Sequence, residues 1–454
     1  MREYSSQELE RLDKQYIWHP FTQMKDWQAE ESLIIAAGQG SYLEDIQGHR
    51  YLDGVSSLWV TIHGHRQKDI DRAIVEQLSR IGHSTFLGLS HIPAIKLAKK
   101  LMEITPKNLA KVFYSDNGST AVEISLKMAF QFWRQCEKRQ PSRTRFLSFA
   151  NGYHGDTVGS VSVGGIDLFH KMYRPLLFKS IRVHSPYCYR CHLGKEYSQC
   201  RMSCLAEVEE AIDRHQGKIA AIVIEPLIQA AGGMITFPPG YTRRIQELAS
   251  KHDILFIADE VATGFGRTGT LFACAHEKLK PDFLTVAKGI TGGYLPLAAT
   301  LTAQRVFDAF CREYKEKKTF FHGHTYTANP LACVAALSNL EVFERENTLA
   351  KLKDKIAFLK KGLKNFWELK HVGDIRQLGF MVGIELVRDR DTKRPYPYAA
   401  KTGIKVIKEA RKRGLVIRPL GDVIVLIPPL SMSLKELEKL LEITYDSIKV
   451  ITEQ

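Results

Sequence analysis

Residues 254–260 read ILFIADE, an apolar run that ends in two acids, Asp259 and Glu260. A short apolar run bounded by polar residues is typical of a strand that is buried on both faces of a sheet. A carboxylate at the end of such a strand is stable only where a positive group or hydrogen-bond donors meet it. The stretch therefore predicts a buried strand whose carboxyl end faces a polar site.

Apolar runs of the same kind recur along the chain, with helical patterns between most of them. In one helical pattern, Val122, Leu126, Ala129 and Trp133 recur at spacings of 4, 3 and 4 residues. Strands that alternate with helices indicate βαβ units and a mostly parallel sheet. The expected strands lie at residues 111–114, 145–149, 220–224, 254–258 and 283–287.

The two ends of the chain have a different pattern. The turn pair Gln47-Gly48 separates two strand-like runs and predicts a hairpin within residues 40–53. After about residue 330 a long helix precedes a mixed tail, in which residues 416–418 and 423–427 resemble a small antiparallel pair. We predict a large α/β domain with a mainly parallel sheet and a smaller α+β domain. The expected boundaries are residues 1–75 for an N-terminal segment that packs with the small domain, 76–330 for the large domain and 331–454 for the small domain.

Composition excludes several classes of protein. The 454 residues are 44% hydrophobic and 25% charged, which is ordinary for a globular protein and not for a disordered, collagen-like or disulfide-scaffold chain. Because no run of 18 apolar residues and no secretory signal are found, we expect no membrane partner and a cytoplasmic location. The net charge of +14 permits nucleic-acid binding, but the charges are scattered over mixed Lys/Glu patterns. We therefore expect solvated helix faces and no nucleic-acid partner.

Ligands of open α/β sheets bind beyond the carboxyl ends of the strands, and one such position is suited to an anion. Residues 115–120 read SDNGST, between an expected strand and an expected helix. Small residues, hydroxyl groups and the free N–H groups of a helix start can bind a phosphate. Ordinary helix capping by Ser119 and Thr120 explains the same run.

Two further strand ends carry Asp259 and Lys288. Asp259 suits a protonated ring nitrogen, although it can simply cap its strand. Lys288 leaves an apolar strand and enters a glycine-rich turn. A lysine partly removed from water has a lowered pKa and attacks carbonyl carbons, whereas the alternative is a lysine that reaches solvent from the strand end. A phosphate cradle, an acid for a pyridinium and a Schiff-base lysine are together the groups that pyridoxal phosphate requires.

The chain resembles the class III (ω-) aminotransferases over nearly its whole length. The signature is DEVATGFGRTG at residues 259–269, followed by Lys288, which lies 29 residues after Asp259. Within that class it is similar to the branch that converts 8-amino-7-oxononanoate to 7,8-diaminononanoate in biotin biosynthesis. The stretches that carry this similarity are IWHPFTQM at 17–24, NGYHGDT at 151–157, FHGHTY at 321–326 and IRPLG at 417–421.

The resemblance implies the aspartate-aminotransferase fold (fold type I) and an obligate homodimer with active sites at the subunit interface. It implies a ping-pong transamination through pyridoxal phosphate, in which Lys288 is the catalytic residue that holds the cofactor and moves the proton. Asp259 would pair with the ring nitrogen. The other implied cofactor contacts are Gly118, Ser119, Tyr153, Glu225, His324 and Thr325, the last from the other subunit.

The implied substrates are 8-amino-7-oxononanoate, whose carboxylate Arg418 would bind, and an amino donor. The implied substrate contacts are Phe21, Leu58, Trp59, Tyr153, Lys288, Gly323 and Arg418. Three of the implied contacts have a plainer alternative: Tyr153 as a core aromatic, Arg418 as a surface charge, and the cofactor contact Glu225 as a strand cap. Phe21, Leu58 and His324 differ from the residues common in the family, and the donor therefore stays open between S-adenosylmethionine and lysine.

One motif falls outside this pattern. Cys188, Cys191, Cys200 and Cys204 lie within 17 residues, with His184 and His192 nearby. This spacing suits a tetrahedral zinc site, and disulfides or free thiols are the alternatives. The chemistry implied by the family needs no metal.

Two other functions stay open at this point. Another class III enzyme, acting on ornithine, 4-aminobutyrate or a β-amino acid, would share the same cofactor residues. A basic nucleic-acid-binding protein is the non-enzymatic alternative, and it rests on the charge of +14 alone.

Overall fold

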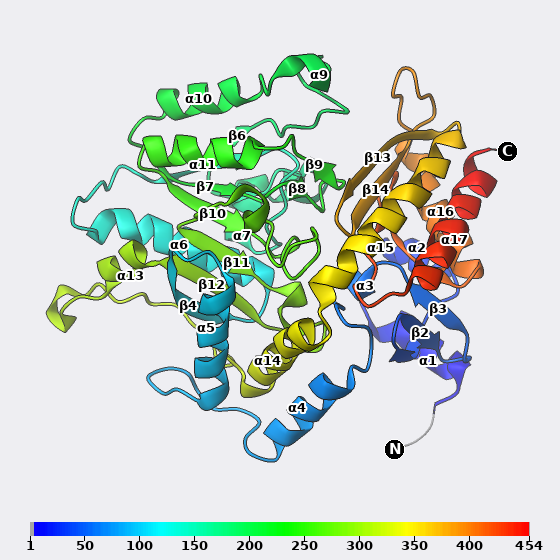
Figure 1. The fold of residues 1–454 in the computed structure, drawn as a ribbon, viewed down its shortest axis with the longest axis horizontal. Helices are drawn as coiled ribbons and strands as arrows, with labels where there is room; N and C mark the ends of the chain where they lie inside the picture. The colour runs from blue at the N-terminus through cyan, green and yellow to red at the C-terminus, as the bar shows by residue number, and fades with distance from the viewer. Residues whose placement is uncertain (1–3, 454) are drawn as a thin grey trace.

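The computed structural model describes residues 4–453 of the chain. A seven-stranded sheet with helices on both faces forms one side of the molecule, and two four-stranded sheets with their own helices form the other (Figure 1). The first helix, α1 (Ser6–Tyr16), and the last helix, α17 (Leu434–Thr452), both lie on the side of the smaller sheets (Figure 1). This arrangement confirms the predicted fold class. Between residues 4 and 453, no helix has both the length and the apolar character needed to cross a bilayer.

The large sheet is parallel except for one strand. Its strands are, in spatial order, β4 (Leu109–Ser115), β12 (Ala298–Ala303), β11 (Phe283–Val286), β10 (Leu255–Asp259), β7 (Ile219–Ile224), β5 (Arg145–Phe149) and β6 (Ile181–Val183). All five runs expected as strands are confirmed. Strand β12 is antiparallel to both neighbours and was not foreseen. It follows β11 through a short segment with only the 3-10 turn η2 (Lys288–Thr291), whereas a parallel return needs a longer crossover.

Strand β10 shows why both faces of this sheet are apolar. Leu255 and Ile257 belong to a cluster of buried apolar side chains that includes those of helix α6 (Gly118–Gln135). Phe256 and Ala258 belong to a second such cluster, which includes those of helix α11 (Tyr241–Lys251). Alternate side chains of a strand point to opposite faces, so a strand covered on both sides reads as a continuous apolar run. Helices α5 (Ile92–Ile104), α10 (Leu205–Arg214) and α13 (Gln304–Phe310) complete the covering (Figure 1).

Helix α6 buries the face expected from its periodicity. The buried positions include Val122, Leu126, Ala129 and Trp133. The helix begins with a capping box, in which the Asn117 side chain accepts a hydrogen bond from the Thr120 backbone N–H and the Thr120 side chain accepts one from the Asn117 N–H. This cap holds the start of the helix at the carboxyl end of β4.

Two smaller sheets lie beside the large one. The first is β1 (Ile35–Gln39), β2 (Tyr42–Asp45), β3 (Arg50–Asp53) and β15 (Leu415–Val416), and the second is β13 (Val372–Leu378), β14 (Met381–Leu386), β17 (Val423–Leu426) and β16 (Arg418–Leu420). The hairpin within residues 40–53 is confirmed. The predicted C-terminal antiparallel pair is confirmed for Arg418, which pairs with β17. The prediction is wrong for Val416, which joins the N-terminal sheet beside β3. A short apolar run does not reveal which of two sheets it will join.

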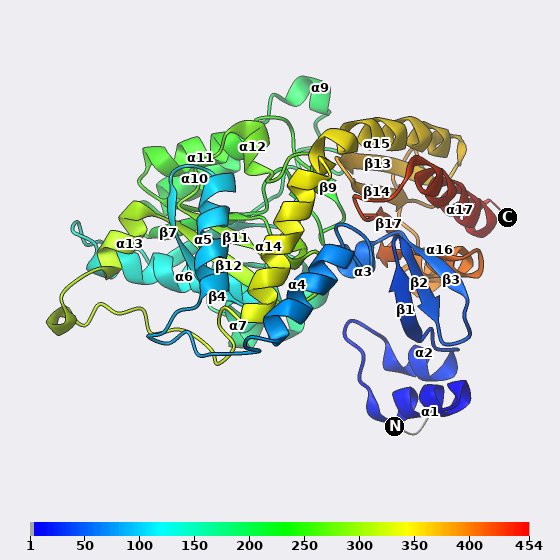
Figure 2. The same cartoon turned by 60° about the horizontal axis from the view of Figure 1, so that its bottom comes forward.

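Helices cover the smaller sheets and connect them to the large one. These are α15 (Thr348–Gly362), α16 (Thr402–Lys412), α17 (Leu434–Thr452), and α14 (Pro330–Arg345), which packs on α4 (Lys68–Leu78), α5 and η2. Helices α1 (Ser6–Tyr16) and α2 (Met24–Ala29) stand at the edge of the molecule (Figure 2). Shorter helices are α3 (Ser56–Trp59), α7 (Val158–Val163), α8 (Asp167–His170), α9 (Tyr197–Cys200) and α12 (Cys274–Glu277), with 3-10 turns at η1 (Lys171–Leu176), η3 (Tyr314–Glu316), η4 (Leu363–Glu368) and η5 (Tyr398–Ala400).

One buried cation ties three distant parts of the chain together. The guanidinium of Arg267 donates to the carbonyl of Thr61 at 3.0 Å and to the carbonyl of Pro428 at 2.8 Å. Burial lowers the pKa of Arg267 to about 9. The N-terminal segment, the segment after β10 and the C-terminal region therefore meet at this side chain. The domain boundaries expected from the sequence stay a prediction.

Candidate active site

A cavity of about 740 Å³ opens at the carboxyl ends of five parallel strands. Lining residues come from the ends of these strands: Asp116–Ser119 follow β4, Tyr153–Thr157 follow β5, Glu225 follows β7, Asp259 is the last residue of β10, and Lys288 follows β11. Chain segments more than 170 residues apart thus meet at one edge of the sheet. This is where ligands of open α/β sheets bind.

Lys288 stands at the floor of the cavity in a strained conformation. Its φ is 45°, and its side chain is half-buried with Nζ 5.4 Å from the centre of the Trp59 ring. Burial lowers the pKa of the Lys288 amine, and the carboxylates nearby offset this only in part. A lysine with a lowered pKa has a larger neutral fraction, and the neutral amine is the form that attacks a carbonyl carbon.

The buried Asp259 carboxylate has three hydrogen-bond partners. Its Oδ2 lies 2.7 Å from Nδ1 of His154, and its Oδ1 accepts from the Val261 N–H at 3.1 Å and from the Thr285 hydroxyl at 3.2 Å. Burial by itself would lower the pKa of His154, but the hydrogen bond and charge of Asp259 outweigh burial and raise it. Three hydrogen-bond partners therefore fix the Asp259 carboxylate at the cavity, where it can meet a cationic ligand group.

The start of helix α6 forms an anion cradle with the segment after β5. Gly118 and Ser119 are the first two helical residues, so their N–H groups have no acceptor within the helix. The Ser119 and Thr157 hydroxyl oxygens are 2.7 Å apart. A Cβ on Gly118 would lie 2.5 Å from Val261, and one on Gly155 would lie 2.3 Å from the Ser119 hydroxyl, so both glycines are needed for this close packing.

A second group of polar residues lies around Tyr153. Its hydroxyl donates to Asp156 at 2.6 Å, and its backbone N–H donates to Glu225 at 3.1 Å. Burial raises the pKa of Glu225 to about 7. Arg418 lies close enough to Tyr153 for their charges to interact, and burial lowers the pKa of this arginine. Arg418 faces this group without lining the cavity itself.

Several residues expected at the site lie at its rim or beyond it. Phe21 is 57% exposed and packs edge-to-face on Phe169 at 5.2 Å, and Phe169 in turn meets Tyr153 at 6.4 Å. Leu58 is 47% exposed, whereas Trp59 lines the cavity. Gly323, His324 and Thr325 belong to a loop outside the cavity of this chain, where His324 Nε2 lies 3.9 Å from Asp116.

Two features of the site were missed by sequence reasoning. His154 lies within the stretch NGYHGDT, which by itself does not indicate its contact with Asp259; its position after strand β5 is the signal that could identify it. Residues 56–59 have four consecutive positive φ angles of 49°, 50°, 92° and 71°. Strain of this kind, about 1–3 kcal/mol per residue, persists where the surrounding structure enforces it, often at ligand sites. Here it presents the Trp59 ring to Lys288.

The residues around the cavity fit pyridoxal phosphate. The cofactor needs a lysine amine, an acid opposite the ring nitrogen and an anion site for the phosphate, and all three line the same cavity. The fit depends on the two glycines of the cradle, because a side chain at Gly118 would meet Val261 and one at Gly155 would meet Ser119.

Comparisons with known proteins agree with a site for pyridoxal phosphate. Residues 24–448 match the family model Aminotransferase class-III. The chain is 52% identical to the adenosylmethionine-8-amino-7-oxononanoate aminotransferase of Geobacter sulfurreducens, over the full length of both chains. It is 49% identical to the protein of the same name from Methanocaldococcus jannaschii, over 97% of this chain and 98% of that one.

Solved structures resemble the whole chain as well. A crystal structure of the Methanocaldococcus jannaschii enzyme has a TM-score of 0.93 at 47% identity, with 98% of this chain and 100% of that chain covered. An ω-transaminase from Pseudomonas jessenii, solved in complex with PMP, has a TM-score of 0.93 at 32% identity, with 98% of each chain covered.

Proposed function

The chain belongs to the class III aminotransferases, and on this basis we propose that it transfers an amino group to the ketone of 8-amino-7-oxononanoate in biotin biosynthesis, with S-adenosylmethionine as the donor. Enzymes of this class depend on pyridoxal phosphate. The observation that carries the proposal is the meeting of Lys288, Asp259 and the start of α6 around one cavity, in a chain similar throughout its length to enzymes of that name.

Bound in this cavity, pyridoxal phosphate supplies an aldehyde that takes up and returns amino groups and a ring that withdraws electrons. The Lys288 amine holds the cofactor between turnovers. Lys288 Nζ would also accept the proton from the substrate carbon, and its lowered pKa favours the neutral form required for this transfer.

The other residues position the reactants. Asp259 would bind the protonated ring nitrogen, and Nδ1 of His154 holds the Asp259 carboxylate at 2.7 Å from Oδ2. Gly118 and Ser119 bind the phosphate through N–H and hydroxyl groups at the start of α6. Arg418, next to Tyr153, binds the carboxylate of the keto substrate, because a charged hydrogen bond of about 1.5–3 kcal/mol favours an acid-bearing molecule.

We also propose a homodimer in which Thr325 of one chain reaches the cofactor of the other. Exposed apolar side chains gather on two adjoining segments: Leu87 is 70% exposed, Phe321 79% and Tyr326 62%. The segments touch where the His83 and Tyr326 rings are 4.9 Å apart. Contiguous exposed apolar surface is normally covered by a partner. Light scattering of the purified protein should give twice the chain mass; the cytoplasmic location stays a prediction.

The test is a donor-by-acceptor assay. Purified protein is supplied with 8-amino-7-oxononanoate and either S-adenosylmethionine or lysine, and 7,8-diaminononanoate is measured by mass spectrometry, with Lys288→Ala as the inactive control. Product with S-adenosylmethionine supports the proposal, and product with lysine alone reassigns the donor.

Two outcomes contradict the proposal at different levels. Amino transfer from ornithine, 4-aminobutyrate or a β-amino acid, without any on the oxononanoate, makes the chain a different class III enzyme. If the purified protein is colourless and binds RNA or DNA with an affinity that depends steeply on salt, the result contradicts the proposal that the chain is an enzyme.

A further inference from the structure

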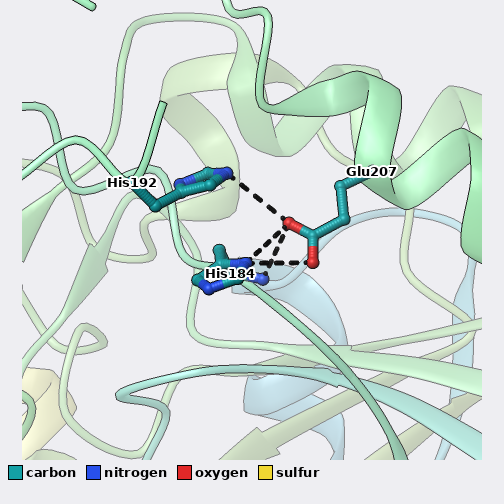
Figure 3. Close-up of side chains that lie close together, drawn as sticks. All are labelled: His184, His192 and Glu207. Atoms are coloured by element: carbon teal, nitrogen blue, oxygen red, sulfur yellow. Dashed lines mark hydrogen bonds and ion pairs between the residues drawn. The ribbon is translucent and has the colours of Figure 1, made fainter. Parts of the chain in front are cut away.

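Two histidines and one glutamate meet outside the catalytic cavity, where the chain passes from β6 to α10 (Figure 3). His184 directly follows β6, His192 lies in the loop that comes next, and Glu207 is in the first turn of α10. One ligand atom from each residue lies within 4.8 Å of the other two. None of the three side chains lines the cavity of Lys288, so transamination leaves this trio unexplained.

The cysteines expected as zinc ligands do not form such a group. In the part of the chain that the structure describes, residues 4–453, the trio is the one set of three or more histidine, cysteine, aspartate or glutamate side chains with ligand atoms this close together. The sulfurs of Cys188, Cys191, Cys200 and Cys204 are free thiols and not paired in disulfides. Spacing along a loop does not determine where its side chains point, and here the two histidines beside the cysteines meet a carboxylate.

The separations among the three side chains suit ligands of one small ion. Nδ1 of His184 lies 3.0 Å from both carboxylate oxygens of Glu207, and Nε2 of His192 lies 3.6 Å from one of them. Nitrogen and oxygen ligands bind zinc at about 2.0–2.2 Å, which places two ligands of the same ion about 3–4 Å apart. The three groups are thus already near the distances that a shared ion requires.

The carboxylate of Glu207 is held in place by its surroundings. The backbone N–H of His184 donates to Oε2 of Glu207 at 3.1 Å. Glu207 also belongs to the first turn of α10, where the free N–H groups of the helix favour a negative side chain. Supporting contacts of this kind orient the ligands of metal sites. Glu207 is therefore an anionic ligand positioned before any ion binds.

The two imidazole rings are stacked, with their centres 4.2 Å apart and their planes 10° apart. Two protonated rings at this distance would repel each other, and burial together with the neighbouring ring lowers the pKa of His192. A neutral ring keeps the nitrogen lone pair that binds a metal. Because stacked rings direct their lone pairs along parallel planes, one ring must turn to share an ion. The side chain of His184 is 58% exposed, so it can turn without displacing a packed neighbour.

We propose that His184, His192 and Glu207 bind one divalent transition-metal ion of the Zn²⁺ type, with water in its remaining positions. Two imidazoles and a carboxylate suit zinc and its first-row neighbours, whereas Ca²⁺ and Mg²⁺ prefer ligand sets made of oxygen alone. In the metal-free chain, Nδ1 of His184 donates a hydrogen bond to Glu207. On binding, that proton moves to Nε2 of the same ring and Nδ1 becomes the ligand. No proton is released, because both rings enter the site neutral and the carboxylate enters as the anion.

The ion fastens a segment that has few packed contacts of its own. Residues 192–199 are all exposed. Bonds from one ion to His184, His192 and Glu207 join the end of β6, this loop and the start of α10. Metal binding supplies ordering energy that the loop lacks in apolar contacts.

The experiment uses the untagged full-length protein, loaded with pyridoxal phosphate and cleared of metal by a chelator. Co²⁺ is the probe, because its binding can be followed by absorption. Equilibrium dialysis should find about one ion per chain, with d–d bands and without thiolate-to-cobalt absorption. His192→Ala and Glu207→Gln should each weaken binding roughly tenfold or more. His49→Ala is the matched control that should not, because exposed His49 meets only the carboxylate of Asp45, at 3.2 Å.

A second measurement on the unmodified protein covers the case in which a variant fails to fold. Diethyl pyrocarbonate, which acylates neutral imidazole, should modify both His184 and His49 in the metal-free protein, since their side chains are 58% and 70% exposed. With Co²⁺ present, peptide mass spectrometry should show that His184 is protected while His49 still reacts.

Several results overturn the proposal. Equal modification of His184 with and without Co²⁺ does so, as does a protein that binds no Co²⁺. Thiolate-to-cobalt absorption in place of the d–d bands would move the ion to the cysteines. Binding that is unchanged in His192→Ala and Glu207→Gln, or weakened as much in His49→Ala, would show that the trio is not the site.

Discussion

His154 Nδ1 and Asp259 Oδ2 are 2.7 Å apart, although 105 residues separate them in the chain, and both side chains are almost fully buried. The imidazole comes from the turn after β5 and the carboxylate from the end of β10. Because Asp259 raises the pKa of His154, the ring is a charged donor to the carboxylate over a wider pH range than a free histidine. The pair therefore holds a negative group in place at the base of the cavity.

Asp259→Asn should lower kcat/KM by about 10- to 150-fold, because an amide cannot form the charged hydrogen bond of about 1.5–3 kcal/mol with a protonated ring nitrogen. His154→Gln, which keeps a hydrogen-bond donor but removes the charge, should have a smaller effect. Steady-state kinetics with the absorption spectrum of the cofactor checks both. Equal activity of Asp259→Asn and the unmodified enzyme would show that the ring lies elsewhere.

Lys288→Ala should lose more than the 10²–10⁴-fold that proton transfer alone contributes, since the same amine also holds the cofactor. Borohydride followed by peptide mass spectrometry should locate the reduced cofactor on Lys288 and find none in the variant. Lys355→Ala is the matched control, because Lys355 is another half-buried lysine whose pKa burial lowers, outside the cavity. Near-full turnover of Lys288→Ala would refute the assignment.

Arg418→Met should raise the KM for the keto acid by about 10- to 150-fold with a smaller change in kcat, because it removes a charged hydrogen bond to the carboxylate. Arg411→Met is a suitable comparison, since burial also lowers the pKa of Arg411, which faces Tyr51. Single-turnover rates with the amino donor should be unchanged in both variants if that donor does not use Arg418. An unchanged KM would place the substrate carboxylate at another residue.

Glu225 predicts a pH dependence of stability in the cofactor-free protein. Its pKa of about 7 in the folded chain exceeds the usual value of 4.5, so the folded state binds its proton more tightly than the unfolded state does. The contribution to stability is complete below pH 4.5 and is lost as the pH rises through about 7. Glu225→Gln lacks this loss. Denaturant unfolding at pH values from 5 to 8 should therefore show the free energy of unfolding of Glu225→Gln rising relative to that of the unmodified protein. A difference in free energy that stays constant with pH would contradict the assignment.

Gly155→Ala should weaken cofactor binding, because the new Cβ would lie 2.3 Å from the Ser119 hydroxyl and the residue has φ of 120°. Gly217→Ala is the matched control: this glycine also has a positive φ of 70° but no atom within 4 Å of the added carbon. Cofactor titration followed by absorption should show weakened binding for Gly155→Ala alone. Similar losses in both variants would mean that backbone strain, and not the cradle, causes the effect.

The fold and the main chemical groups of the site were predictable because their signals are local. The apolar run of β10 and the 4-3-4 spacing on α6 each lie within one element, and the motifs around Asp259 and Lys288 lie within a few residues of a strand end. The antiparallel direction of β12 and the transfer of Val416 to the N-terminal sheet were not predictable in this way, because strand partners come from distant parts of the chain.

Local pattern was thus enough to identify an α/β chain with a lysine, an acid and an anion site at the carboxyl ends of its strands. Tertiary packing decided that these groups surround one cavity, that His154 holds Asp259, and that a strained segment presents Trp59 to Lys288. Contacts such as these join residues far apart in the chain. Their distances depend on how whole elements pack, which periodicity and spacing along a single segment do not encode.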